Sequence, residues 1–377
     1  MTNERVLQLN FGPHNSTAIG PFCLNLQLDG EIVVKADPEV GFLHRGIEKI
    51  CERLPWLGLH PFVDRVDYLA PIHGNLAYSL AVEKLMSLDV PKRASQIRVI
   101  TGELNRIESH LYSIGYLASR LGCGTALMYM LRDREKVNNL FEMLCGARLT
   151  YNYIRIGGVS HDVTEGFIEK TYEFLDFLRP KLKEYKDILT ENAIFSGRLS
   201  NIGVLYYEKC ISAAITGPNL RGSCDSSKLM WDLRKVEPYS GYESYDFDFN
   251  TGLCESMKGD CFSRYLVRLA EIDQSMNLVR QGLDRLVEGP FRTNPPLGDK
   301  GLLRPPIGEA YAAVEGPRGL FGVYIYSDGG VTPGRIKFRP PSLNVFSVLP
   351  ELLEGHQISD INAIVGSLDI MMSEVDR

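Results

Sequence analysis

Cysteine and histidine are the residue types that most readily bind metals, and their spacing in this chain matches no metal-binding motif. The eight cysteines include no Cys-x-x-Cys pair, the usual mark of a zinc ribbon or an iron–sulfur ligand set. The seven histidines show neither His-x-x-x-His nor His-Glu-x-x-His spacing, and no Gly-x-Gly-x-x-Gly or P-loop motif marks a nucleotide site. We therefore predict that the chain alone binds no metal and no nucleotide.

The overall composition argues against two further classes of interaction. Lys and Arg number 41 against 47 Asp and Glu, and the formal charge of -6 leaves no basic footprint for nucleic acid. No apolar run approaches the roughly 18 to 20 residues needed to span a bilayer, and the first residues lack a signal-peptide profile. We expect a soluble chain whose association with a membrane depends on a partner.

The hydrophobic pattern changes its period along the chain. Residues 5 to 35 alternate apolar and polar positions around an expected turn at Asp29-Gly30, which predicts a small antiparallel sheet. Apolar residues then recur at intervals of three and four, which predicts long packed helices over residues 71–88, 92–121, 126–147, 165–192 and 258–288. A short sheet is expected from Ala310–Val314, Phe321–Tyr326 and Arg335–Arg339.

These elements predict a mainly α fold with small β elements, of the α+β class. A length of 377 residues with 44% hydrophobic side chains is enough for two or three packed regions around one large core. We expect an N-terminal α+β region over 1–69, a helical bundle over 70–213, and a helix with loops and short strands over 214–377.

Ordered motifs along almost the whole chain carry a family resemblance. They are Leu9-Asn10-Phe11-Gly12-Pro13, Gly41-Phe42-Leu43-His44-Arg45-Gly46, Asp64-Arg65-Val66-Asp67-Tyr68-Leu69, Glu103-Leu104-Asn105-Arg106, Tyr153-Ile154-Arg155-Ile156-Gly157-Gly158, Glu237-Pro238-Tyr239-Ser240-Gly241-Tyr242, and Glu374-Val375-Asp376-Arg377. With them the chain resembles the D subunit of respiratory complex I and the corresponding subunit of the methanogen dehydrogenase that oxidises reduced coenzyme F420. Both belong to the superfamily of nickel-iron hydrogenase large subunits, which implies a long helical bundle with an N-terminal sheet.

The positions that hold nickel in hydrogenases carry other residues here. Asp67 and Ala70 stand where the resemblance places the cysteines of an Arg-Val-Cys-Gly-Ile-Cys motif, and Met371 and Glu374 stand at the two cysteine positions of the tail. These side chains cannot rebuild a site of four soft thiolates. We expect the old metal cleft to be empty.

The resemblance implies a site for a quinone at the interface with a partner. In complex I this subunit packs against a small subunit that carries the terminal 4Fe-4S cluster, and the two enclose the inner end of the quinone tunnel. The headgroup tyrosine maps onto Tyr68, whose phenol could donate a hydrogen bond to a quinone carbonyl and supply a proton as that oxygen becomes basic. The alternative is a buried tyrosine with an ordinary backbone partner.

The chain departs from the family at the site's His-Asp pair. Ile19 takes the place of the histidine, and Arg120 takes the place of the aspartate on the long helix. A joint loss is easier to explain than a single one, because a carboxylate left facing an apolar residue carries a desolvation cost. His14 and His44 are candidates to replace the pair; alternatively each forms a loop hydrogen bond or is solvated.

Three residues are expected near the partner's cluster, and three residues of the tail are expected to have roles of their own. The resemblance places Arg65 and Arg155 beside the cluster, where their charge would raise its potential; without it each would be a surface or interface ion pair. Thr150 replaces a family histidine, so pH-linked tuning there should be absent. Asp369 is expected to line the quinone site, and Asp376-Arg377 to lock the tail in place.

The leading hypothesis is a quinone-site core subunit of a membrane-bound, proton-translocating oxidoreductase of the complex I type. The chain would bind no cofactor alone; the quinone would lie at an interface and the cluster in an iron–sulfur B-type partner, with C-type and membrane-arm H-type subunits as further partners. It would lie on the cytoplasmic side of the cell membrane and be inactive in isolation.

The alternatives are a noncatalytic scaffold subunit and a group 4 hydrogenase-like large subunit. The sequence leaves open the electron donor and the quinone. Gly20-Pro21-Phe22 resembles the methanogen branch of the family, which implies an acceptor other than ubiquinone, such as menaquinone or methanophenazine.

Overall fold

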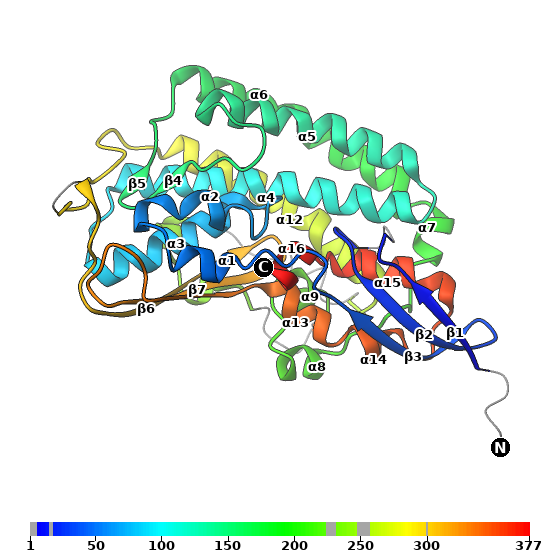
Figure 1. The fold of residues 1–377 in the computed structure, drawn as a ribbon. Helices are drawn as coiled ribbons and strands as arrows, with labels where there is room; N and C mark the ends of the chain where they lie inside the picture. Colours follow the sequence, from blue (N-terminus) through cyan, green and yellow to red (C-terminus); the bar gives the residue numbers. More distant parts are fainter. Residues whose placement is uncertain (1–5, 15–17, 224–230, 247–256, 299–300) are drawn as a thin grey trace.

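The structure is a computed structural model that describes residues 6–14, 18–223, 231–246, 257–298 and 301–377. Long helices form the centre, with a three-stranded sheet at one end and a second three-stranded sheet along one side (Figure 1). The α+β class predicted from the sequence is confirmed. Among the described residues, no helix is both long and apolar enough to cross a membrane.

The N-terminal sheet is antiparallel and follows the order β1-β2-β3, with bounds Val6–Phe11, Cys23–Asp29 and Ile32–Glu39. The turn between β2 and β3 falls at Asp29-Gly30, where Gly30 has a φ of +60° that suits a residue without a Cβ. Leu24, Leu26 and Leu28 point to the buried face of β2, which is the alternation that the sequence predicted.

The predicted long helices are all present. They are α3 (Pro71–Met86), α4 (Lys92–Arg120), α5 (Gly124–Cys145), α6 (Glu165–Tyr185) and α12 (Cys261–Asp284). α4 packs against α5 and α12 and is buried along almost its whole length, so it serves as the axis of the bundle. The helix expected to reach residue 192 ends as an α-helix at Tyr185 and continues as a π-helical turn, η2 (Lys186–Thr190).

Short elements fill the rest of the described chain. They are α1 (Ile47–Cys51), η1 (Trp56–Gly58), α2 (His60–Val63), β4 (Ile154–Arg155), β5 (Gly158–Val159), α7 (Ala193–Gly197), α8 (Tyr207–Ser212), α9 (Pro218–Gly222), α10 (Leu233–Val236), η3 (Tyr242–Ser244), α13 (Pro341–Ser347), α14 (Leu349–Leu353), η5 (Ile358–Asp360), α15 (Ile361–Leu368) and α16 (Met372–Asp376).

The second large sheet has the order β6-β7-β8 and supports α3. Its strands are β6 (Gly308–Gly316), β7 (Gly319–Ser327) and β8 (Arg335–Arg339), all antiparallel. The three predicted strands are confirmed, and the first two are longer than expected. β6 and β7 run to a tight hairpin, so that Pro317 and Arg318 stand alone at its tip. This tip is what brings Arg318 into the interior.

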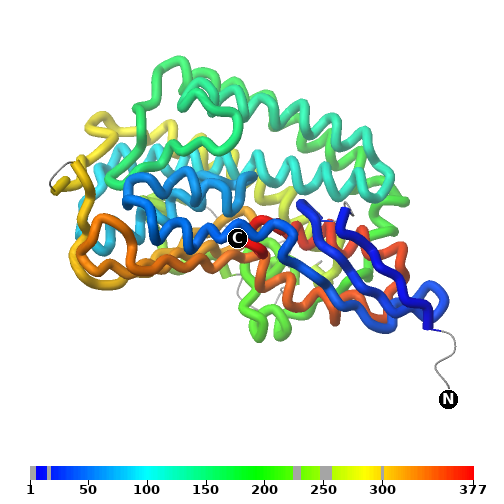
Figure 2. Tube along the Cα trace, viewed as in Figure 1, coloured from blue at the N-terminus to red at the C-terminus, as the bar shows by residue number. Residues whose placement is uncertain are grey.

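The C-terminal helix α16 lies at the centre of the molecule, beside the segment that follows β3 (Figure 2). The carboxylate of Asp376 accepts hydrogen bonds from the backbone N–H groups of Gly41 (2.9 Å) and Leu43 (2.7 Å). The guanidinium of Arg377 pairs with Glu48 at 3.1 Å. These contacts give the final two residues the locking geometry that was expected of them.

Gly157 packs its backbone too closely against another loop to carry a side chain. Its φ is +87°, and a Cβ there would fall on the carbonyl oxygen of Thr293. We expect Gly157→Ala to lower the free energy of unfolding by about 3 kcal/mol, from left-handed strain and overpacking together. Gly146→Ala is the matched control, because its φ is +72° but a Cβ there would meet nothing within 4 Å. Urea unfolding of the purified proteins checks this; equal losses in both variants would contradict the steric argument.

Candidate functional site

Tyr68 lies in a small cluster of its own, apart from the main core. Ile19, Leu69 and Met371 form its buried part, and the rings of Tyr68, Tyr112 and Tyr116 pack against them. Backbone hydrogen bonds join the Ile19 segment to the tail, from Ile19 N–H to the Ile370 carbonyl (3.3 Å) and from Met372 N–H to the Ile19 carbonyl (3.0 Å). The structure therefore brings Ile19 and Tyr68 together, as the family motifs predicted.

The hydroxyl of Tyr68 is available for chemistry. It forms no hydrogen bond with any other described residue, so the alternative of an ordinary backbone partner does not apply within those residues. Burial raises the pKa of Tyr68, and the neighbouring Asp67 raises it further, so the phenol keeps its proton at neutral pH. A protonated donor thus borders an apolar and aromatic surface.

α4 supplies an aromatic wall to this cluster. The rings of Tyr112 and Tyr116, one helical turn apart, stack with centroids 5.8 Å apart and planes within 16°. The Arg120 guanidinium lies 4.4 Å from the centroid of the Tyr116 ring, one further turn along. Arg120 is therefore on the helix face that approaches Tyr68. Neither tyrosine was predicted from the sequence, although the spacing of 112, 116 and 120 places them on that face.

The old metal cleft is not empty. Arg318, at the tip of the β6–β7 hairpin, donates from Nη1 to Asp67 Oδ2 at 2.6 Å, and its Nε lies 3.4 Å from Asp369 Oδ2. The cavity that remains is about 10 Å³. The expectation of a vacant cleft was wrong because a guanidinium fills it and supplies positive charge to the surrounding carboxylates.

The four positions expected to lie around the old metal site do not all line the remaining cavity. Asp67, Ala70 and Glu374 line it, whereas Met371 packs in the Tyr68 cluster. Asp369 is 4% exposed, lies against Arg318 and Arg268 (4.0 Å), and is not among the residues that line the cavity. A flat ring could not enter so small a space.

The cleft has an excess of carboxyl groups. Burial and the neighbouring Asp67 raise the pKa of Glu374 to about 8. Burial also raises the pKa of Asp67, with Asp369 adding to the shift and Arg318 opposing it. Glu374 pairs with the Ser342 hydroxyl and accepts from the Ser342 N–H at 3.3 Å. The cleft therefore holds at least one proton at neutral pH.

This proton predicts a pH dependence of stability. The folded-state pKa of Glu374, about 8, exceeds its ordinary 4.5, so proton binding by Glu374 stabilises the folded protein. This contribution is fully present below about pH 4.5 and is lost as pH rises to 8. Glu374→Gln, which mimics the protonated form, should show a smaller fall in unfolding temperature between pH 5 and pH 8. Glu351→Gln is the control, since Glu351 is 68% exposed and pairs only with Lys209. Parallel profiles in all three proteins would refute the assignment.

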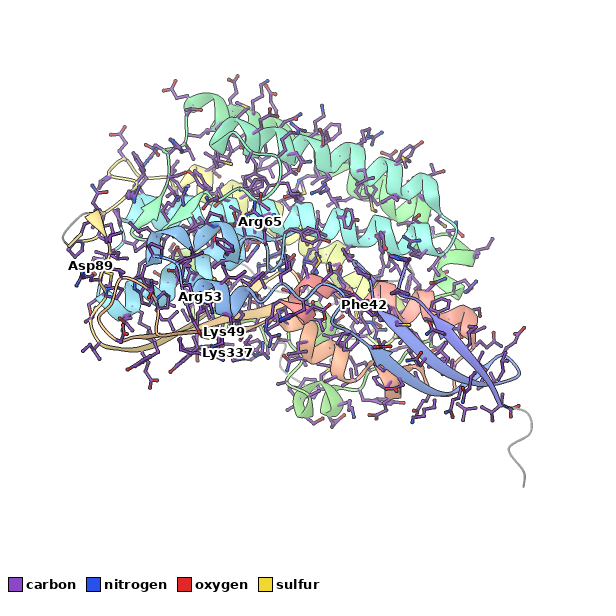
Figure 3. All side chains as sticks on the ribbon, viewed as in Figure 1. Phe42, Lys49, Arg53, Arg65, Asp89 and Lys337 are labelled. Atoms are coloured by element: carbon purple, nitrogen blue, oxygen red, sulfur yellow. The ribbon has the colours of Figure 1, made fainter. Side chains whose placement is uncertain are left out.

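The two arginines predicted near a partner's cluster are not part of the Tyr68 cluster. Arg65, labelled in Figure 3, is exposed, and both Arg65 and Arg155 face the buried carboxyl of Asp64. Arg155 also lines a cavity of about 270 Å³ with His60 and Arg292. Arg65 and Arg155 thus lie near the same buried carboxyl, and Arg155 lies beside a second arginine, Arg292.

Three other predicted residues also lie outside the Tyr68 cluster. Thr150 has a φ of +53° and its hydroxyl donates to the Leu149 carbonyl at 2.7 Å. His14 is exposed and is not part of the Tyr68 cluster, while residues 15–17 beside it lie outside the described part of the chain. His44 bonds through Nδ1 to the Asp376 carbonyl at 2.8 Å and so belongs to the tail lock.

Across the described ranges, no three His, Cys, Asp or Glu side chains are grouped in a way that could hold a metal ion. The residue types at the cleft therefore favour proton transfer and ion pairing. The surface beside them favours an aromatic or apolar ligand with a hydrogen-bond acceptor.

Comparison with known proteins gives the family. The model described as "Respiratory-chain NADH dehydrogenase, 49 Kd subunit" matches residues 120–300 and 299–377. The D subunit of the NADH-quinone oxidoreductase of Desulforamulus reducens is 46% identical over 368 residues, which cover 98% of this chain and 97% of the relative. The D subunit of the same enzyme from Geobacillus thermodenitrificans is 42% identical over 377 residues and the full length of both.

A solved structure agrees over the whole chain. It is a chain of the membrane-bound sulfane sulfur reductase, an archaeal respiratory membrane complex, with a TM-score of 0.93, 35% identity and 100% coverage of both chains. The resemblance predicted from the motifs is confirmed by these matches. The chain belongs to the family of the 49 kDa subunit of respiratory-chain NADH dehydrogenase, and is a member of its D type.

Proposed function

We propose that this chain is the quinone-site subunit of a membrane-bound oxidoreductase of the complex I type. The observation that carries the proposal is the protonated hydroxyl of Tyr68, without a hydrogen-bond partner among the described residues, beside the apolar Ile19 and Met371 and the stacked tyrosines of α4. A quinone head has two carbonyl acceptors on a flat ring, and this surface offers a donor and a flat aromatic wall.

In this proposal the electrons come from a 4Fe-4S cluster in an iron–sulfur B-type partner. Arg65 and Arg155 would face that cluster and stabilise its reduced form. The quinone takes up two electrons and two protons, and Tyr68 donates one proton to the carbonyl oxygen as it is reduced. C-type and H-type subunits would complete the assembly at the cytoplasmic side of the membrane, where proton translocation is coupled to this step.

The structural relative supports a second candidate. It comes from a sulfane sulfur reductase, so the same fold at 35% identity also occurs in a complex with another named acceptor. In that case this chain would serve as a scaffold without a quinone site, as the replacement of the family's His-Asp pair by Ile19 and Arg120 would permit.

Photoaffinity labelling of the assembled complex distinguishes the quinone-site function from the scaffold function. A photoreactive quinone should label peptides that contain Tyr68 or Tyr112, and excess unlabelled quinone should compete. Tyr112→Ala should reduce labelling, whereas Tyr129→Ala should not, since Tyr129 also lies under an arginine but on α5. Labelling confined to other subunits would reject the proposed site.

A further inference from the structure

His73 is a buried histidine on α3 with an unusual lack of partners. Its side chain is 3% exposed, and although the Asn105 side chain lies close enough to affect its pKa, neither ring nitrogen forms a hydrogen bond of normal geometry with the described residues. Leaving a buried polar group unsatisfied costs about 1 to 3 kcal/mol, so such a group in a native protein calls for a water or a function.

One side of His73 faces the small cavity in the old metal cleft. The cavity of about 10 Å³ is lined by His73 together with Asp67, Arg318 and Glu374. Nη2 of Arg318 also has no hydrogen-bond partner among the described residues. A space of this size holds about one water when several polar groups surround it, and this one is polar on several sides. A single water here would connect His73 to the carboxyl groups next to Tyr68.

His73 also faces Gly102 of α4, a position without a side chain. A Cβ built on Gly102 would lie 3.9 Å from His73 Nε2 and 3.8 Å from the Tyr242 hydroxyl, so both groups border the same space. The Tyr242 hydroxyl donates to Glu103 Oε1 at 2.5 Å. Glu103 is fully buried and also pairs with Arg234 at 2.9 Å. His73 therefore stands between the cleft and a second buried group of ionisable side chains.

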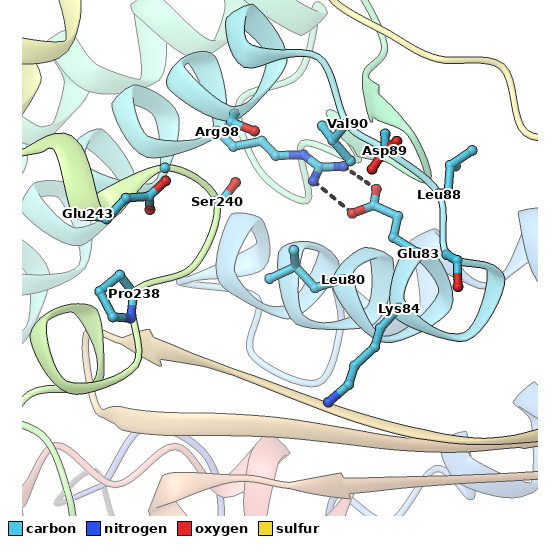
Figure 4. Close-up of a pocket in the computed structure, with 13 residues that line it drawn as sticks. Leu80, Glu83, Lys84, Leu88, Asp89, Val90, Arg98, Pro238, Ser240 and Glu243 are labelled. Atoms are coloured by element: carbon cyan, nitrogen blue, oxygen red, sulfur yellow. Dashed lines mark hydrogen bonds and ion pairs between the residues drawn. The ribbon is translucent and has the colours of Figure 1, made fainter.

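Tyr242 is itself 3% exposed and is not among the residues that line the nearest groove, but its neighbours in the chain are. Gly241 and Glu243, on either side of Tyr242, line an open groove of about 710 Å³. Figure 4 shows the groove with Glu243 and Pro238 on one side and the buried Glu83–Arg98 pair on the other. The chain neighbours of Tyr242 thus meet solvent in this groove, whereas the Tyr242–Glu103 hydrogen bond is buried.

We propose that His73 relays protons from the side of Tyr242, through the cleft carboxyls, to Tyr68 and the reduced quinone. This inference rests on the proposed function. Each turnover adds two electrons from the partner's cluster and two protons from solvent to the quinone. At each hop His73 accepts a proton at one ring nitrogen and releases one from the other, and a tautomer change resets it, so no relay group gains or loses charge overall.

The charges around His73 are consistent with a neutral relay. Glu103 and Arg106 face it from α4, Arg234 from α10 and Arg318 from the β6–β7 hairpin. Burial lowers the pKa of His73 well below its ordinary range, and Arg106 lowers it further. The ring is therefore neutral and keeps one N–H donor and one lone pair, which a proton relay requires.

The decisive variant is Gly102→Ala in the assembled complex. The added methyl makes only ordinary contacts and favours the helix, so the protein should fold, but the methyl fills the space between His73 and Tyr242. We expect quinone reduction to slow by about threefold or more and its solvent deuterium isotope effect to increase. Gly166→Ala on α6, where a Cβ meets nothing within 4 Å, should leave both unchanged.

His73→Leu provides the stronger test, with an expected loss of about tenfold or more in quinone reduction and an unchanged reduction of the partner's cluster. Wild-type turnover and isotope effect in Gly102→Ala would overturn the relay, even if His73→Leu fails to assemble. Tyr68→Phe run in parallel keeps the two ideas apart. If Tyr68→Phe is inactive while the His73 and Gly102 variants have wild-type turnover, the proposed relay is rejected and the proposed quinone site is retained.

Discussion

Tyr68→Phe should lower quinone-dependent turnover of the assembled complex by about 100-fold or more, because a general acid in contact with the substrate typically contributes at least that much. The change removes one oxygen that has no hydrogen-bond partner among the described residues, so assembly and stability should be nearly unaffected. The measurement is donor oxidation at saturating quinone, with reduction of the partner's cluster recorded separately.

Tyr129→Phe is the matched control, since this tyrosine of α5 also lies near an arginine but outside the Tyr68 cluster. Its turnover should equal that of the wild type. If Tyr68→Phe also retains full activity at saturating quinone, the scaffold function is favoured and the catalytic role of Tyr68 is abandoned.

Arg318→Met should destabilise the protein by about 3 to 5 kcal/mol, because it leaves Asp67 and Asp369 buried without their main counter-charge. Arg280→Met is the control: its pair with Asp176 is exposed, with side-chain exposures of 40% and 71%, and should contribute less than about 1 kcal/mol. Denaturant midpoints of the purified proteins measure both.

A double variant separates lost charge compensation from lost packing. Asp67→Asn combined with Arg318→Met removes one of the stranded carboxylates, so its loss should be smaller than that of Arg318→Met alone. An Arg318→Met protein as stable as Arg280→Met would show that the guanidinium does not balance the cleft.

The helices and sheets could be predicted because their hydrophobic periods are long and uninterrupted. The bounds of α4 differ from the expected 92–121 by a single residue, since its apolar positions repeat until the Leu121-Gly122 break. The two nine-residue strands of the β6–β7 hairpin were underestimated, because glycine and alanine in β6 weaken the strand pattern.

The site could be predicted only where a motif fixed it. Counting along family motifs placed Ile19 beside Tyr68, where the structure has it, and periodicity alone would not have done so. Arg120 lies over the Tyr116 ring of the same cluster. Arg318 and His73 could not be found this way. Gly316-Pro317-Arg318-Gly319 reads as an ordinary surface turn, and only the packing of α3 on β6 and β7 turns that tip inward. In the sequence, His73 is one more residue of a buried helix. Only the structure shows that its ring nitrogens form no hydrogen bond of normal geometry with the described residues.

The most direct test is a density map of the assembled complex with its quinone bound. The ring is expected against Ile19, Met371 and the stacked tyrosines of α4, with one carbonyl oxygen within hydrogen-bonding distance of the Tyr68 hydroxyl and Arg318 still filling the old metal cleft. A quinone bound away from this surface, or a Tyr68 hydroxyl turned from the ring in the reduced complex, would contradict the proposed site.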